Sequence, residues 1–267
     1  METIASKQHP WIKRWRALQS PHTAKKERRI RVEGVRHVAD VVASGGKIDA
    51  LFFSDDDAGR AAAEAIGNDC FAEVTRTVAP HLFATLTDAT TPQGVAAIAR
   101  LPNTTLEEVL AAAPARLAVL VLDGVQDPGN VGTLIRTADA LAFDAVILGE
   151  GTASVWNPKT VAATMGSLFH IPVIEWRRPL ADAMACLQAR GIRVLGADLN
   201  GETVDLDWRA PARVALVLGN EGRGLDPDTV DRVDTTVTLA MPGGAESLNV
   251  ATAGAILMWV VAGSRPL

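Results

Sequence analysis

Three segments in the second half of the chain combine glycines with polar residues that could do chemistry. The first, DPGNVGTLIRTADA, spans residues 127–140 and contains Asn130 and Arg136. Its glycines allow the backbone to approach a ligand closely, and the helix start together with Arg136 could hold a phosphate or activate a hydroxyl group. The alternative is a helix capped by Asn130 that carries an ordinary surface arginine. This segment alone leaves both interpretations open.

The second segment, LGNEGRGL, spans residues 218–225 and places Glu221 among three glycines. Glycines directly after a strand are typical of a phosphate-binding loop, but this spacing matches neither the dinucleotide-binding fingerprint nor the P-loop. The carboxylate of Glu221 also argues against an anionic ligand and favours a ligand with a cationic or hydroxyl-rich portion. A structural turn explains the glycines equally well.

The third segment, LAMPGGAESLNVATAGAI, spans residues 239–256. Met241 and Leu248 could enclose an aromatic base between apolar walls, and Ser247 and Asn249 offer neutral hydrogen bonds to it. The alternative is that Ser247 or Asn249 caps the helix that closes the chain.

The elements around these segments alternate between strand and helix. LAVLVL at 117–122 is a continuous apolar run, as expected of a strand that is buried on both faces. Further strands are expected at 145–149, 172–176, 192–198, 214–219 and 235–241, and helices at 130–142, 158–166, 180–190, 227–233 and 248–262. The pattern predicts an α/β domain with a mostly parallel sheet and helices on both faces. Ligands bind beyond the C-terminal ends of such strands, where the three segments lie.

The first hundred residues predict a second, smaller α/β domain. Helices are expected at 9–19, 31–44, 58–66 and 79–86, and strands at 48–54, 71–75 and 94–99. The segment LPNTTLEEVLAAAPAR contains two prolines around a short Ala-rich helical pattern and marks the junction. We therefore expect a domain over 1–101, a linker over 102–115 and a second domain over 116–267.

Charge is distributed unevenly along the chain. Residues 1–36 hold ten Lys and Arg against three Glu, a net +7, so the remainder carries −12 of the total of −5. A basic segment on an acidic body could contact a phosphate backbone, and a solvated pair of charged helices is the alternative.

Composition limits the class of protein. Hydrophobic residues make up 48% and charged residues 21%, as in a soluble globular protein. The two cysteines and five histidines match no disulfide, zinc or redox spacing, and we expect no metal site. No apolar run is long enough to span a membrane and the N-terminus has no signal-peptide pattern, so we expect a cytoplasmic protein.

In order, the segments DPGNVGTLIRTADA, LGNEGRGL and GGAESLNVATAGAI resemble the three motifs of the SpoU (TrmH-like) branch of the SPOUT RNA methyltransferases. The similarity covers about residues 116–262. The earlier segments VEGVRHVADVV (32–42) and TPQGVAAIA (91–99) are similar to the ribosomal-protein-like substrate-binding domain that often precedes this catalytic domain.

The resemblance implies an RNA-binding domain over 1–101 and a SPOUT catalytic domain over 116–267 with a C-terminal trefoil knot, an exception to the rule that chains do not thread loops. It implies a homodimer with the active site at the interface. The implied reaction is transfer of the methyl group of S-adenosylmethionine to a ribose 2′-hydroxyl of RNA, with 23S-type rRNA favoured and tRNA as the alternative.

Matched by position, Arg136 corresponds to the arginine thought to assist deprotonation of the 2′-hydroxyl, and Asn130 to the asparagine near it. The implied catalytic residues are Arg136, Asn130, Glu221, Ser247 and Asn249. The implied cofactor-binding residues are Leu218, Gly219, Asn220, Gly222, Leu239, Met241, Leu248 and Asn249. One position departs from the family pattern, because Ala240 precedes Met241 where a proline is usual.

Two other classes of function are alternatives. A non-catalytic RNA-binding protein with the same fold would not need the intact polar motifs, and binding of S-adenosylmethionine would separate it from an enzyme. A nicotinamide-dependent oxidoreductase would need a glycine-rich turn of the required spacing after the first strand of an α/β region, and neither region has one.

Overall fold

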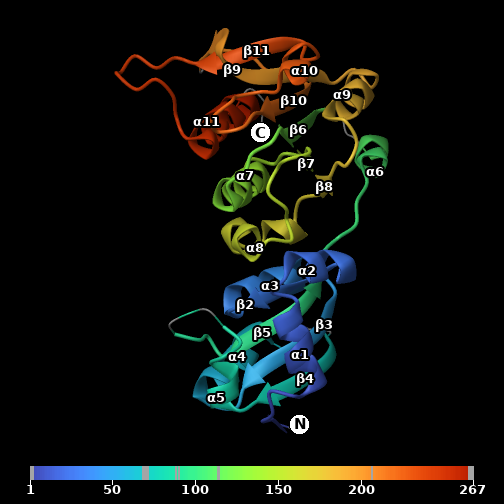
Figure 1. Cartoon of the computed structure of the whole chain (residues 1–267), viewed down its shortest axis with the longest axis vertical. Coiled ribbons are helices and arrows are strands. Elements are labelled where there is room, and N and C mark those ends of the chain that lie inside the picture. Colours follow the sequence, from blue (N-terminus) through green and yellow to red (C-terminus); the bar gives the residue numbers. More distant parts are fainter. Residues whose placement is uncertain are drawn as a thin grey trace. The chain divides into compact units, whose positions relative to one another are not determined.

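The apolar runs of the chain form two separate sheets, one of five strands in the first hundred residues and one of six strands in the second half. The computed structural model describes residues 3–67, 72–87, 89, 91–112, 115–205 and 207–263. The chain divides into two units, Met1–Pro102 with Trp156–Val161 and Asn103–Val155 with Ala162–Leu267 (Figure 1). We refer to them as the N-terminal unit and the C-terminal unit.

The sheet of the C-terminal unit is parallel in every recorded pairing of its strands. Its order is β11-β9-β10-β6-β7-β8. The strands are β6 (Leu117–Leu122), β7 (Ala145–Leu148), β8 (Val173–Glu175), β9 (Arg193–Val204), β10 (Arg213–Leu218) and β11 (Thr235–Leu239). Leu122 pairs with Leu218, so β6 and β10 end at the same level and their following loops start side by side.

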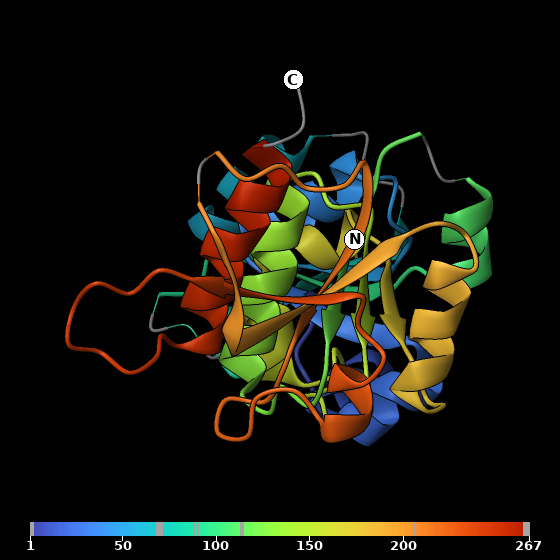
Figure 2. The same ribbon diagram turned by 90° about the horizontal axis from the view of Figure 1, so that it is seen from above.

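Helices cover both faces of this sheet (Figure 2). The helices of this unit are α6 (Leu106–Ala111), α7 (Pro128–Ala140), α9 (Leu180–Gln188), α10 (Pro227–Val230) and α11 (Val250–Gly263), with a 3-10 turn η1 (Ser167–Phe169). Helix α8 (Pro158–Thr164) is divided between the two units at Val161. Alternate residues of β6 pack with α6 and α9 in one buried cluster. On the other face α11 packs against α7, and a Cβ at Gly254 would lie 2.5 Å from side-chain atoms of Leu134 and Leu218. Gly254 therefore sets how closely α11 approaches.

The N-terminal unit has a mixed sheet of order β1-β4-β3-β5-β2. Its strands are β1 (Thr3–Ile4), β2 (Arg29–Glu33), β3 (Ile48–Ser54), β4 (Ala72–Val78) and β5 (Val95–Arg100). Its helices are α1 (Pro10–Ala17), α2 (Pro21–Glu27), α3 (Val35–Ala43), α4 (Asp57–Ile66) and α5 (Pro80–Phe83). β5 runs antiparallel to both of its neighbours, β2 and β3.

The helix expected at 31–44 is wrong at its start. Residues 29–33 form β2, with Ile30 and Val32 buried and their neighbours half-buried, so the period is two rather than 3.6. Gly34 has a φ of 89°, which separates this strand from α3. The prediction also missed the short helix α2 and the two-residue strand β1.

The predicted junction at 102–115 contains α6, which begins with a capping box between Thr105 and Glu108. In the part of the chain that the structure describes, no helix is both long and apolar enough to cross a membrane. Within the same residues, no group of three or more His, Cys, Asp or Glu is placed to hold a metal ion.

Candidate active site

The loop after β10 is a tight turn that closes on itself. Asn220 and Gly224 exchange backbone hydrogen bonds of 2.8 and 2.9 Å. A Cβ at Gly219 would lie 2.2 Å from the Gly224 carbonyl carbon, so any side chain there would force the loop apart. Gly219 therefore allows the start of the loop to pack directly against the backbone of Gly224 at its end.

Asn220 ties this loop to the end of β6. Its Nδ2 donates to the carbonyl of Gly124 at 2.8 Å, and its Oδ1 accepts from the backbone N–H groups of Gly222 and Arg223 at 3.0 and 3.1 Å. The Asn220 side chain thus holds the loop after β10 to the loop after β6.

Helix α7 begins two residues earlier than predicted. Asp127 is the N-cap, and its carboxylate accepts from the backbone N–H of Asn130 at 2.8 Å, while Pro128 occupies the first helical position. The interpretation of Asn130 as the cap is wrong. Its side chain is consequently available for other contacts.

Glu221 lies against the start of α7. Its carboxylate accepts from the backbone N–H groups of Gln126 and Asp127 and from Asn130 Nδ2, each at 3.1 Å. Burial opposes ionisation of this group, but the hydrogen bonds from Gln126, Asn130 and Asp127 outweigh it and hold the pKa of Glu221 below its ordinary value. The carboxylate is therefore occupied by donors of the first motif.

The third motif joins through Asn249. Its Nδ2 donates to Asn130 Oδ1 at 3.2 Å, and its Oδ1 accepts from the backbone N–H groups of Ala251 and Thr252 at the start of α11. Asn249 is thus both the helix cap of the alternative interpretation and a member of the polar site. Glu221, Asn130 and Asn249 form one chain of hydrogen bonds across all three motifs.

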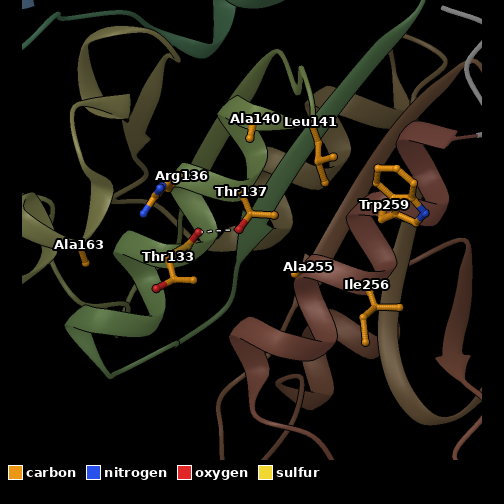
Figure 3. A pocket seen from close by; sticks show the side chains of 9 residues that line it. All are labelled: Thr133, Arg136, Thr137, Ala140, Leu141, Ala163, Ala255, Ile256 and Trp259. Carbon is orange, nitrogen blue, oxygen red and sulfur yellow. Dashed lines mark hydrogen bonds between the residues drawn. The ribbon is translucent and has the colours of Figure 1, made fainter. Parts of the chain in front are cut away.

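Arg136 lies just over two turns into α7 and is exposed. It borders a pocket of about 540 Å³ between α7 and α11, shown in Figure 3. The lining residues are Thr133, Arg136, Thr137, Ala140, Leu141, Ala163, Ala255, Ile256 and Trp259. The described residues offer the Arg136 guanidinium no hydrogen bond or ion pair, so its donors are available to an incoming group.

The loop between β11 and α11, residues 240–248, takes no part in the hydrogen-bonded chain of Glu221, Asn130 and Asn249. Figures 1 and 2 show it projecting from the C-terminal unit. Ser247 is exposed and Met241 half-buried, and Leu248 has 39% of its surface exposed. Residues 240–248 make no backbone or side-chain hydrogen bond with any residue that the structure describes.

The loop and the strand ends beside it fit the adenosine part of S-adenosylmethionine. Backbone N–H and C=O groups need hydrogen-bond partners, and those of 240–248 are open to a ligand. Leu239, Met241 and Leu248 supply apolar side chains for a base, and no charge stands among these three side chains.

Sequence reasoning missed one supporting residue. Thr152, in the loop after β7, accepts from the backbone N–H of Gly124 at 3.0 Å and donates to the carbonyl of Leu122 at 2.9 Å. It holds the loop after β6 in place from the neighbouring strand. The only local signal was its position after two glycines near a strand end.

Both units match known families. Residues 117–259 match the SpoU rRNA Methylase family, and residues 9–97 match the MRM3-like substrate binding domain. The chain is 36% identical over 263 residues to the 23S rRNA (guanosine(2553)-2′-O)-methyltransferase RlmP of Bacillus subtilis, covering 98% of this chain and all of that protein.

Solved structures agree along almost the whole chain. The SpoU methyltransferase AviRb from Streptomyces viridochromogenes in complex with AdoMet has a TM-score of 0.84 and 26% identity, with 96% of this chain and 97% of that chain covered. An AdoMet-bound rRNA methyltransferase from Sinorhizobium meliloti has a TM-score of 0.80 and 30% identity, with 97% and 96% covered. The chain belongs to the SpoU rRNA methylase family, the S-adenosylmethionine-dependent RNA methyltransferases.

Proposed function

We propose that this chain methylates a ribose 2′-hydroxyl of 23S rRNA. The hydrogen-bonded chain Glu221–Asn130–Asn249 is the observation that carries the proposal, because it joins all three motifs beside the helix that carries Arg136. The full-length similarity to a 23S rRNA 2′-O-methyltransferase favours this RNA over tRNA. Since rRNA lies in the cytoplasm, the proposal places the protein there.

The cofactor and Arg136 have different roles in the proposed reaction. S-adenosylmethionine, when bound, supplies a methyl group made electrophilic by the sulfonium sulfur. Arg136 donates hydrogen bonds to the ribose 2′-oxygen, orients it and stabilises the negative charge that develops as the hydroxyl loses its proton. A guanidinium normally stays protonated in proteins, so this role fits it better than that of a base.

Asn130 and Asn249 hold the three motifs together. Because Glu221 accepts from Asn130 Nδ2 and Asn249 donates to Asn130 Oδ1, the orientation of the Asn130 amide is fixed from both ends. The proposed cofactor site is completed by Leu218, Gly219, Gly222, Leu239, Met241 and Leu248. Ser247 is proposed as a catalytic residue. The trefoil knot and the assignment of RNA binding to residues 1–101 stay predictions.

The test of the function is methylation of defined RNAs. The protein is incubated with tritiated S-adenosylmethionine and unmodified 23S rRNA, 16S rRNA or tRNA, and the label is followed after alkaline hydrolysis. Label in an alkali-resistant dinucleotide from 23S rRNA is the expected result. Label in tRNA would overturn the choice of RNA, label on a base would overturn the ribose assignment, and failure to bind the cofactor would favour a non-catalytic RNA-binding protein.

We also propose that two copies of the chain associate through the face formed by α7 and α11. Trp259 has 59% and Ile256 has 41% of its surface exposed, and both border the pocket beside Arg136 (Figure 3). Large apolar side chains grouped on one face mark an interaction surface. A twofold dimer uses the same patch on both subunits, so α7 and α11 would meet their own counterparts next to the site.

Replacing Trp259 by glutamate should convert the dimer to a monomer. The charge would be buried without a partner in the interface, which disfavours association strongly. Light scattering during size-exclusion chromatography gives the mass, with Leu199→Glu on β9 as the control because Leu199 is also exposed, at 61%. A Trp259→Glu protein that stays dimeric would place the interface elsewhere.

Only part of the basic charge in the N-terminal unit is available to RNA. Arg14 pairs with Glu27 at 2.9 Å, and Arg29 and Arg100 both pair with Asp49. Lys13 and Arg16 are exposed and lie three residues apart on α1, so they share one face of that helix. Arg16 has no acidic partner in an ion pair with the described residues, and its guanidinium donates one hydrogen bond, to Thr85 Oγ1 at 3.2 Å. We propose that this face of α1 contacts the phosphate backbone.

The double substitution Lys13→Glu and Arg16→Glu should raise the KM for RNA about tenfold at low salt, and the difference should shrink as salt rises. The KM for S-adenosylmethionine should stay unchanged. The matched control is Arg190→Glu with Arg232→Glu, two exposed residues of the C-terminal unit that give the same change in net charge. Equal effects of the two double substitutions would show that only net charge matters, against a contact at α1.

A further inference from the structure

Asp139 is the only acidic residue on α7, and it follows Arg136 by three residues. Side chains at this spacing are neighbours on the helix surface, where an arginine and an aspartate readily form an ion pair. Such a pair would neutralise the Arg136 guanidinium. In the proposed mechanism this group stabilises the negative charge that develops on the ribose 2′-oxygen. Arg136 nevertheless has no hydrogen bond or ion pair with the described residues.

The Asp139 carboxylate is held by His170 instead. His170 Nδ1 lies 3.1 Å from Asp139 Oδ2. Because an ionised carboxylate can only accept, the hydrogen of this bond is on the imidazole nitrogen. His170 directly follows η1 and its backbone N–H donates to the Ser167 carbonyl at 3.0 Å, so its position is set by that turn.

The Arg136 side chain leaves α7 in a different direction from the Asp139 side chain. Figure 3 shows its side chain pointing toward Ala163, away from Ile256 and Trp259 of α11. Ala163 belongs to α8, in the same stretch of chain that leads through η1 to His170. This stretch therefore borders Arg136 on one side and engages its neighbouring carboxylate through His170.

We propose that His170 is a positioning residue that holds Asp139 away from Arg136 and so keeps the guanidinium unpaired for the substrate. The proposal rests on the proposed role of Arg136. His170 does not touch the reacting atoms. Without it, Asp139 would be free to turn toward Arg136 and to compete with the ribose oxygen for the same donors.

Four full-length proteins test this inference: wild type, His170→Ala, Asp139→Asn and the double variant. The measured quantity is the single-turnover methylation rate at saturating S-adenosylmethionine and RNA. His170→Ala should lower the rate about fivefold, the effect expected of one exposed ion pair. Asp139→Asn should stay near wild type, and the double variant should recover the lost rate because no carboxylate is left to compete.

His170→Asn provides a conservative variant, since its amide can donate from nearly the position of Nδ1, and its rate should stay near that of wild type. A double variant as slow as His170→Ala would overturn the inference, because His170 would then act through the fold alone. An unchanged rate for His170→Ala would overturn it as well. Melting temperatures of all variants identify any loss of folded protein.

Arg136→Ala, measured in parallel, separates this inference from the proposed function. If Arg136→Ala keeps its rate, the role of Arg136 is wrong and the inference falls with it. If Arg136→Ala loses its rate while the double variant shows no recovery, the role of Arg136 stands and the inference alone is wrong. Adding His170→Ala to Arg136→Ala should cause no further loss.

Discussion

Arg136→Ala lowers the rate of methyl transfer by about 10²–10³-fold, the loss typical when one donor to a developing oxyanion is removed. The affinity for S-adenosylmethionine stays within about twofold, because the proposed cofactor residues lie in other loops. The rate of Arg136→Lys lies between those of the wild type and Arg136→Ala, since lysine keeps the charge but loses the planar set of donors. Single-turnover kinetics and equilibrium cofactor binding measure the two effects separately.

Arg190→Ala is the matched control, because Arg190 is an exposed arginine two residues after the last residue of α9. It should leave both the rate and the affinity unchanged. If Arg136→Ala keeps near-wild-type activity, Arg136 neither deprotonates nor orients the hydroxyl. If it loses cofactor affinity in proportion to its rate, Arg136 belongs to the cofactor site instead.

Asp49→Asn destabilises the N-terminal unit by about 3 kcal/mol, the scale expected when one member of a buried ion pair is removed. Asp49 has 1% of its surface exposed and pairs with both Arg29 and Arg100. An asparagine of the same shape leaves these guanidinium groups without their shared counter-charge. Calorimetry gives the stability, and hydrogen exchange of peptides from β2, β3 and β5 locates the loss.

Glu73→Gln is the control, because Glu73 also pairs with Arg100 but its side chain is 62% exposed. Exposed pairs contribute about 0–1 kcal/mol, so this change should be small. A similar loss from both substitutions would contradict the special importance of Asp49.

The same ion pairs predict how stability depends on pH. Burial opposes ionisation of Asp49, but Arg29 and Arg100 outweigh it and lower its pKa below the ordinary value. The stabilisation is therefore complete above the ordinary aspartate pKa and is lost as pH falls toward the lowered value. Asp49→Asn should flatten this acid limb of the stability profile.

Local patterns were sufficient where a segment's own residues decide its structure. The continuous apolar run at 117–122 predicts a strand with both faces buried, and β6 is that strand. RIRVE at 29–33 also carries a local signal, an alternation of period two, but the helical residues that follow it led to a helix prediction over 31–44. Misjudging the period at one boundary was enough to lose β2.

The sequence by itself determined the alternation of strands and helices in the C-terminal unit, the position of the three motifs after strand ends and the similarity to a methyltransferase family, because these depend on neighbouring residues. Only the tertiary structure decided the use of each polar side chain. Glu221 reaches Asn130 across 91 residues and Asn130 reaches Asn249 across 119, and no local pattern encodes contacts over such separations. The start of α7 at Pro128, with Asp127 as its cap, likewise decides that Asn130 serves the site and does not cap the helix. The Asn130 side chain is available because Asp127 caps α7, and the parallel strands β6 and β10 end together and bring Glu221 to it.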